Sequence, residues 1–277
     1  MELVPIEQGL ARVLGGRIAH DDEIGVRYAL SDDGRARLKL PFAPFLTAAG
    51  EECIGIGPLV TVLDSACGIG AMLAMGFREG TATVDLRVDY LRAPSAGASC
   101  MVTAMPVDVG GQPEAGMVMM HAEAREMTGG DVLAHATGRF IRRRLPAPGK
   151  APSLPPALSK PTAADYPALM GFAPEGAGLR MPFRPGLVGN GSLPSLHGGA
   201  VAAHLQQAAC SALAVESRRP ARLVTGHFSF LRFAGAADTL ASAVIERRGA
   251  SVASVEAASW QEPGRATARG VFTFAWM

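Results

Sequence analysis

The sequence predicts an α+β fold in which one unit occurs twice, each unit being a long apolar helix wrapped by an antiparallel sheet. First, the helix-like stretch GIGPLVTVLDSACG (55–68) has a counterpart in HGGAVAAHLQQAAC (197–210). Second, strands with a shared ending follow the two helices, YLRAPSAGAS (90–99) and FLRFAGAADT (230–239). Third, apolar and polar residues alternate between short turns in the rest of both halves, which indicates antiparallel meanders.

Predicted strands surround the helix in each half. A hairpin at 25–41 precedes the first helix, and residues 179–185 are its counterpart before the second. The strands after the helices are predicted at 81–93, 99–110, 115–127, 132–144, 222–233, 239–249, 251–262 and 266–276. The stretch between the halves is Pro-rich, which predicts an extended linker. We therefore place the N-terminal unit at 1–145, the linker at 146–174 and the C-terminal unit at 175–277.

The composition excludes several classes of protein. The 277 residues are 48% hydrophobic and 18% charged, which supports a substantial core and argues against disorder. A net charge of +1 gives no field that would indicate a nucleic-acid partner. The four cysteines are scattered without a C-x-x-C pair, and the N-terminus does not resemble a signal peptide. We expect a cytoplasmic protein without a metal site.

The first helix-like stretch belongs to a run that is long enough to cross a bilayer. Residues 54–77 carry a single charge, Asp64. However, the run contains Pro58 and several glycines, and its counterpart carries His204 and Gln206, which would face lipid poorly. We therefore predict a buried core helix and no contact with a membrane.

The polar residues are divided unevenly between the two copies of the helix. Gly55 aligns with His197, and Asp64 aligns with Gln206. The second copy has a His-Gly-Gly entry but no carboxylate, whereas the first has the carboxylate but lacks that entry. Two incomplete half-sites predict one complete site assembled between the halves.

These motifs lead to a resemblance. A loop, a His-Gly-Gly sequence opening a long helix, an acid further along such a helix and the strand TVDLRVDYLR resemble the hotdog-fold acyl-CoA thioesterases of the phenylacetate-pathway type. The resemblance covers residues 25–144 and 175–277 and implies a double hotdog, in which one chain imitates the dimer of the family. It implies hydrolysis of an acyl-CoA substrate with no cofactor, and a homodimer of the double-hotdog chain is the expected assembly.

The resemblance assigns catalytic roles residue by residue. The loop residue Asn190 and the helix residue Gly198 come from the second half, and Asp64 and Thr83 come from the first. A helix N-terminus offers free N–H groups, so Gly198 would stabilise the oxyanion. Asp64 has apolar neighbours and is expected to have a raised pKa; it would act either as general base on water or as nucleophile. Thr83 and Asn190 would orient the water and the carbonyl.

Two further residues are assigned to substrate binding, and one site is expected to be inactive. His197 and Gly199 at the helix entry would contact the substrate. The opposite pairing would use Gly55 and Gln206, which supplies no base, so we expect that site to be degenerate. Asn190 lies one position further from the His-Gly-Gly entry than the family pattern has it.

Other interpretations remain open at this point. Asp64 and Thr83 could be structural, the glycines could serve helix packing, and Asn190 could belong to an ordinary turn. A hotdog dehydratase or hydratase would need a His and an acid on one loop-helix element, a pairing that neither copy shows. A third alternative is a non-catalytic acyl-CoA-binding protein. Basic residues at 142–144, Arg92 and Arg232 are candidates for contacting the phosphates of coenzyme A.

Overall fold

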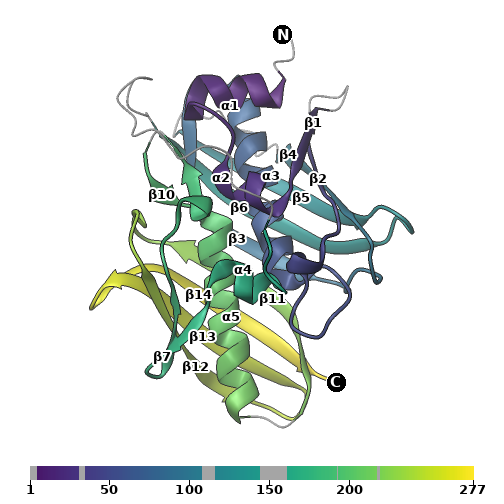
Figure 1. Cartoon of the computed structure of the whole chain (residues 1–277), viewed down its shortest axis with the longest axis vertical. Helices are drawn as coiled ribbons and strands as arrows, with labels where there is room; N and C mark the ends of the chain where they lie inside the picture. Colours follow the sequence, from purple (N-terminus) through teal and green to yellow (C-terminus); the bar gives the residue numbers. More distant parts are fainter. Residues whose placement is uncertain (1–4, 31–34, 108–115, 144–160, 192, 217–218) are drawn as a thin grey trace.

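Two long helices lie against one antiparallel sheet of twelve strands (Figure 1). The computed structural model describes residues 5–30, 35–107, 116–143, 161–191, 193–216 and 219–277. The long helices are α3 (Ile56–Ala74) and α5 (Gly198–Glu216). The strands of the first half are β1 (Arg27–Leu30), β2 (Ala36–Leu40), β3 (Gly80–Tyr90), β4 (Cys100–Pro106), β5 (Met117–Glu126) and β6 (Val132–Arg143). Those of the second half are β7 (Ala173–Glu175), β8 (Gly178–Met181), β11 (Ala221–Phe230), β12 (Thr239–Arg248), β13 (Val252–Glu262) and β14 (Arg265–Trp276).

The order of the strands shows that the two halves are related by a pseudo-twofold axis. The order is β1-β2-β4-β5-β6-β3-β11-β14-β13-β12-β8-β7. Outward from the centre, β3-β6-β5-β4-β2-β1 of the first half corresponds strand by strand to β11-β14-β13-β12-β8-β7 of the second. At the centre β3 pairs with β11, and Arg87 lies opposite His227. The repeat that aligns Tyr90 with Phe230 also aligns Arg87 with His227, so the axis passes through this pair. The duplicated unit predicted from the sequence is therefore confirmed.

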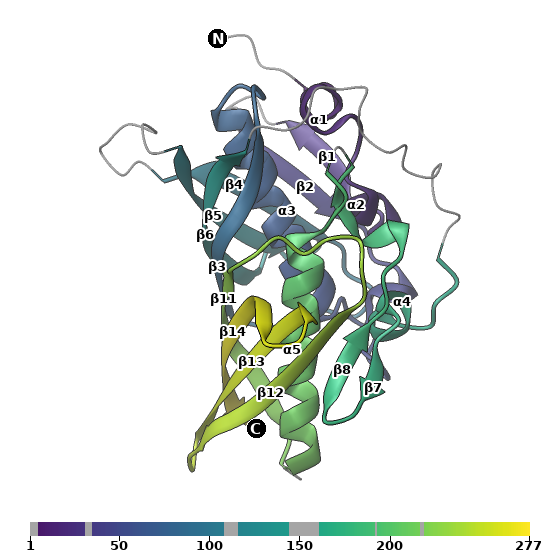
Figure 2. The same cartoon turned by 90° about the vertical axis from the view of Figure 1, so that its left-hand side faces the viewer.

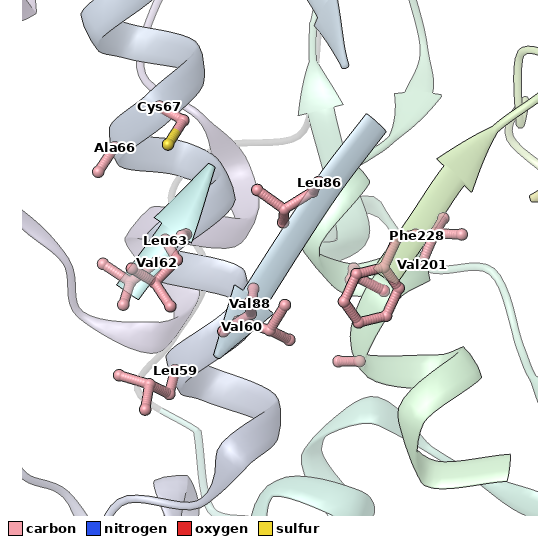
Figure 3. Packing of buried hydrophobic residues seen from close by; sticks show 14 of the residues in the cluster. Leu59, Val60, Val62, Leu63, Ala66, Cys67, Leu86, Val88, Val201 and Phe228 are labelled. Atoms are coloured by element: carbon pink, nitrogen blue, oxygen red, sulfur yellow. The ribbon is translucent and has the colours of Figure 1, made fainter. Parts of the chain in front are cut away.

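The helix α3 is a core helix. It is long and apolar enough to cross a membrane, with a mean hydropathy of 1.6, but 83% of that window is buried inside the molecule. Figure 3 shows Val60 of α3 beside Val88 of β3, and Val201 of α5 beside Phe228 of β11, within one cluster of buried hydrophobic residues. Seen from the side, α3 and α5 lie on the same side of the sheet (Figure 2). The apolar character of α3 is thus explained by its packing, because residues of the sheet and of α5 surround it.

Two short helices precede the first hairpin and were not predicted from the sequence. They are α1 (Ile6–Leu14) and α2 (Ala19–Ile24), and each ends at a glycine in the left-handed region. In α1, Gly9 lies directly on the ring of Phe77, where a Cβ would be 2.4 Å from the nearest ring atom. The spacing of the buried residues of α1 is that of an amphipathic helix.

The segment between the halves differs in part from the predicted extended linker. The linker residues 144–160 lie outside the described part of the chain. Beyond them a short helix, α4 (Tyr166–Met170), starts at Asp165, whose side chain accepts a hydrogen bond from the Ala168 N–H. The first strand of the second half, β7, already begins at Ala173. A capping aspartate four residues before an apolar Leu-Met pair is the local cause of this turn of helix.

Candidate functional site

Asp64 lies in the middle of α3 and is bound by Thr83 of the neighbouring strand β3. The Thr83 hydroxyl donates to Asp64 Oδ1 over 2.9 Å. The carboxylate is 5% exposed, and burial raises its pKa to about 7, against the opposing effect of the Thr83 hydroxyl and the Gly199 N–H. The raised pKa expected from its apolar neighbours is confirmed. An acid of this kind exchanges a proton near neutral pH, which suits a general base.

Gly198, the first residue of α5, lies directly against this pair. A Cβ at this position would be 2.7 Å from Asp64 Oδ2 and 3.2 Å from Thr83 Oγ1. The Gly198 N–H has no hydrogen-bond acceptor among the described residues. The fold therefore places a free N–H at the positive end of a helix beside the carboxylate of the other half. Asp64, Thr83 and Gly198 are brought together, as the uneven repeat predicted.

Asn190 lines the same cavity from the short strand β9 (Val188–Asn190), which pairs with β10 (Ser195–Leu196). Its Oδ1 accepts a hydrogen bond from the Leu193 N–H over 3.3 Å, so the oxygen helps to shape the loop. The loop thus holds Asn190 at the cavity wall despite its extra residue. Asn190 therefore both accepts a hydrogen bond that stabilises the turn and lines the cavity beside Asp64.

His197 and Gly199 were both predicted to contact substrate, and the structure distinguishes them. His197 lines the cavity but is 5% exposed, and burial together with the neighbouring His20 lowers its pKa to about 3, which leaves the ring neutral. Gly199 does not line the cavity. Its N–H donates to His197 Nδ1 over 3.0 Å, and a Cβ would be 2.5 Å from Thr61 Cα. Gly199 thus serves the close packing of α5 on α3, and its predicted contact with substrate stays a prediction.

Sequence reasoning missed the groups behind His197. Ser65 Oγ lies 3.0 Å from His197 Nε2 and donates to Asp21 Oδ1 over 2.6 Å. Asp21 is fully buried, and burial raises its pKa to about 6 against the hydrogen bonds from Ser65 and Tyr28. The run His-Asp-Asp-Glu at 20–23 was a visible signal, but nothing in it distinguishes a buried carboxylate from a solvated one.

The cavity beside Asp64 has a volume of about 310 Å³ and two kinds of lining residue. Part of the lining is buried and apolar and includes Leu14, Ile18, Ile69 and Met72. The more accessible part includes the basic residues Arg143 and Arg232, and the Arg143 guanidinium lies 5.1 Å from the ring centroid of Phe233. Such a lining suits a ligand with both an apolar and a polar portion.

The opposite pairing of the two halves does not form a comparable site. Gln206 Oε1 accepts a hydrogen bond from the Tyr90 hydroxyl over 2.6 Å. The ring of Tyr166 lies against Gly57, where a Cβ would be 2.7 Å away, and the remaining cavity is about 40 Å³. Leu223 occupies the position on β11 that Thr83 occupies on β3. The base, the hydroxyl and the space are all missing, in agreement with a degenerate site.

Two family models match the sequence, one in each half. The model described as "Acyl-CoA thioesterase N-terminal domain" matches residues 190–275, and the model described as "Thioesterase superfamily" matches residues 57–112. The first match includes Asn190 and α5, and the second includes Asp64 and Thr83. A comparison with the curated proteins finds no match.

Solved structures share the whole architecture at low sequence identity. A putative thioesterase II from Thermobifida fusca has a TM-score of 0.64 at 11% identity and covers 94% of this chain and 98% of its own. The tesB protein of Mycobacterium avium subs paratuberculosis has a TM-score of 0.61 at 13% identity, with 95% and 99% covered. A protein of unknown function with a hot dog fold from Alicyclobacillus acidocaldarius has a TM-score of 0.58 at 17% identity, with 94% and 98% covered. At identities this low the likeness concerns the fold, and the predicted α+β double hotdog is confirmed.

Proposed function

Because the chain is a tandem hotdog protein of the thioesterase superfamily, we propose that it hydrolyses acyl-CoA thioesters to the free acid and coenzyme A at one composite site. The observation that carries the proposal is the contact between Gly198 and the Asp64–Thr83 pair, since it joins a free helix N–H to a carboxylate from the other half. Thioester hydrolysis needs both elements at one carbon atom: a donor for the developing oxyanion and a base that delivers water.

In the proposed reaction the thioester carbonyl lies between α5 and β3. The Gly198 N–H donates to the carbonyl oxygen, and this hydrogen bond strengthens as negative charge develops there. In the first route, Asp64 takes a proton from water while the water oxygen bonds to the carbonyl carbon. The carbon–sulfur bond then breaks, and the coenzyme A thiolate leaves with the proton that Asp64 holds. In the second route, the carboxylate of Asp64 attacks the carbon itself, and the carbon–sulfur bond breaks to give an anhydride and the coenzyme A thiolate. Water then cleaves the anhydride to the free acid and restores the Asp64 carboxylate, and the proton released in this step goes to the thiolate.

The proposed orientation of the substrate rests on the two kinds of lining residue. The acyl group lies against the buried apolar residues, among them Met72 of α3 and Leu14 of α1. The pantetheine and nucleotide parts extend past the more accessible Arg143 and Arg232. Cationic side chains there suit the phosphates of coenzyme A, because phosphate oxygens bind guanidinium groups strongly.

The test is the release of free thiol from a panel of acyl-CoA esters. Wild type and Asp64→Asn are compared, with Gln206→Asn as the matched control at the equivalent position of the degenerate half. We expect release by wild type and by Gln206→Asn, and a loss of about 10³-fold or more in Asp64→Asn. Equal rates in wild type and Asp64→Asn would refute the composite site. Binding of acyl-CoA by wild type without any release would instead support the non-catalytic alternative.

A further inference from the structure

We infer that Asp21, acting through Ser65, is a positioning residue that fixes the ring of His197 and with it the N-terminus of α5 at the site. This inference rests on the proposed function, because it assigns a catalytic consequence to the position of Gly198. Asp21 itself is fully buried on α2 and does not line the cavity. It therefore acts on the site from outside the cavity, through the groups that it binds and through its charge.

A continuous series of hydrogen bonds connects Asp21 to the start of α5. The Ser65 hydroxyl donates to Asp21 Oδ1 over 2.6 Å, and the Tyr28 hydroxyl donates to Asp21 Oδ2 over 2.9 Å. Ser65 Oγ lies 3.0 Å from His197 Nε2. On the other side of the imidazole ring, the Gly199 N–H donates to His197 Nδ1 over 3.0 Å. Asp21, Ser65, His197 and Gly199 are buried and Tyr28 is half-buried, so the bonds from Asp21 to the start of α5 are shielded from competing water.

The directions of these bonds select one tautomer of His197. Because Nδ1 accepts from the Gly199 N–H, it carries no proton, and in the neutral ring the proton must be on Nε2. Nε2 then donates to Ser65 Oγ. The single Ser65 hydroxyl proton goes to Asp21 Oδ1 at 2.6 Å and not to the Thr61 carbonyl oxygen at 3.1 Å, because the carboxylate is the nearer and the charged acceptor. A carboxylate only accepts, so the series is fixed in this direction as long as Asp21 is ionised. The opposite tautomer would set an Nδ1–H against the Gly199 N–H and displace it.

The short helix α2 also holds the loop that leads to the site. His20 Nδ1 lies 2.9 Å from the carbonyl oxygen of Gly186, and Glu23 pairs with Arg184. The His197 N–H donates to the Leu187 carbonyl oxygen over 2.8 Å in the same loop. One helix of the first half thus secures both the approach to α5 and, through Ser65, its first residues. A shift of about 1 Å at a reacting group can cost on the order of 100-fold in rate.

Asp21 also acts on the charge of the site. Its negative charge is close enough to Asp64 to raise the pKa of that carboxylate, in addition to the larger effect of burial. The ionisable groups that face Asp21 are Tyr28 of β1, His197 of α5, and His20 and Asp22 of α2. Those that face Asp64 are Asp21, His197 and Cys67. Removing the charge of Asp21 should therefore lower the pKa of Asp64, whereas removing only the Ser65 hydroxyl should not.

The experiment compares Asp21→Asn and Ser65→Ala with Asp22→Asn, a neighbouring exposed carboxylate that pairs with Arg17. We expect kcat to fall about 10- to 100-fold in the first two variants, with KM changed far less. The acid limb of the pH profile of kcat/KM should move to lower pH in Asp21→Asn and stay in place in Ser65→Ala. Asp22→Asn should retain both the rate and the profile. Circular dichroism checks that each variant is folded.

A second readout does not depend on turnover. The ¹⁵N shifts of the His197 ring, assigned with His197→Ala, should show Nε2–H in wild type and a changed tautomer population in Asp21→Asn and Ser65→Ala. Wild-type shifts and wild-type kcat in both variants would overturn the inference. A wild type that binds acyl-CoA, releases no thiol and has the expected Nε2–H tautomer would contradict the proposed function but leave the hydrogen-bond series standing. If Asp21→Asn fails to fold, Ser65→Ala decides through the same two readouts.

Discussion

Replacing Asp64 with asparagine should remove activity and at the same time stabilise the protein at alkaline pH. Burial raises the pKa of Asp64 from 3.8 to about 7. Each pKa unit corresponds to about 1.4 kcal/mol, so ionising this carboxylate inside the fold costs about 4 kcal/mol relative to water. Asparagine has the same shape and keeps an oxygen that accepts from Thr83, but its amide loses the interaction with the Gly199 N–H, which is worth about 1 kcal/mol. The expected net gain in the free energy of unfolding at pH 8 is about 3 kcal/mol.

The sign of the pH dependence follows from the direction of the pKa change. Between pH 3.8 and about 7 the folded protein holds a proton on Asp64 that the unfolded chain has lost. The free energy of unfolding of the wild type should therefore fall as the pH rises through this window, and Asp64→Asn should lack this contribution. The burial of Asp21 is common to both proteins and cancels in the comparison, whereas its repulsion of Asp64 is already included in the raised pKa of that carboxylate. The advantage of the variant should be large at pH 8 and should nearly vanish toward pH 4.

Urea unfolding of both proteins at pH 8 and pH 4.5 measures the difference in their free energies of unfolding. The comparison requires that the free energy of unfolding depends on urea concentration with the same slope in both proteins. Asp22→Asn is the matched control, because it removes a carboxylate of the same charge at an exposed position. The reasoning is refuted if Asp64→Asn is less stable than wild type at pH 8. It is also refuted if the two proteins differ by the same amount at both pH values.

Three further predictions concern the site. Gly198→Ala should lower kcat/KM about 10²- to 10³-fold, because its Cβ would lie 2.7 Å from Asp64 Oδ2. Gly129→Ala, which lies outside the lining of the cavity and whose Cβ would make only an ordinary contact, is the control, and equal losses would count against the assignment. Thiol release should fall as the pH drops below about 7, because the pKa of Asp64 is raised to about 7 and the carboxylate becomes protonated below it. A rate that falls only near pH 4 would contradict this. Calorimetric titration with a non-hydrolysable acyl-CoA thioether should give one site per chain, and two equal sites would show that the pairing at Gln206 also binds.

The architecture could be predicted because its determinants are repeated in the sequence. The helices appear as long apolar runs, the strands alternate, and both patterns occur twice in the same order. The pairing of Asp64 with Gly198 followed from complementarity, since each copy of the helix lacked what the other retained. Thr83 was assigned only through the resemblance, because threonine is a common strand residue and nothing in the strand itself marks it as part of a site. Its bond to Asp64 confirms the contact.

The groups behind the site could not be predicted, because their effect depends on distances between segments that are far apart in the sequence. Asp21 and Asp22 are adjacent and chemically equal, yet one is fully buried and the other pairs with Arg17 at the surface. Only the docking of α2 against α3 decides between them. The role of Gly199 was likewise hidden: a glycine at a helix entry can serve a ligand or a neighbouring helix, and here the backbone of Thr61 lies where a Cβ would be.

The unequal sites follow from the energetics of a buried carboxylate in a fused chain. In a symmetric dimer, any substitution of the helix acid would remove it from both sites, so the cost of about 4 kcal/mol for ionising it would be carried twice. Fusion makes the two positions independent. At the second position Gln206 is neutral, its oxygen accepts from Tyr90, and Tyr166 fills the space beside it. That half contributes stability and the His-Gly-Gly entry, while the first half retains Asp64 and the strain of holding it charged. The free-energy cost of ionising a buried helix carboxylate therefore arises once per chain, in the first half, and not in the second.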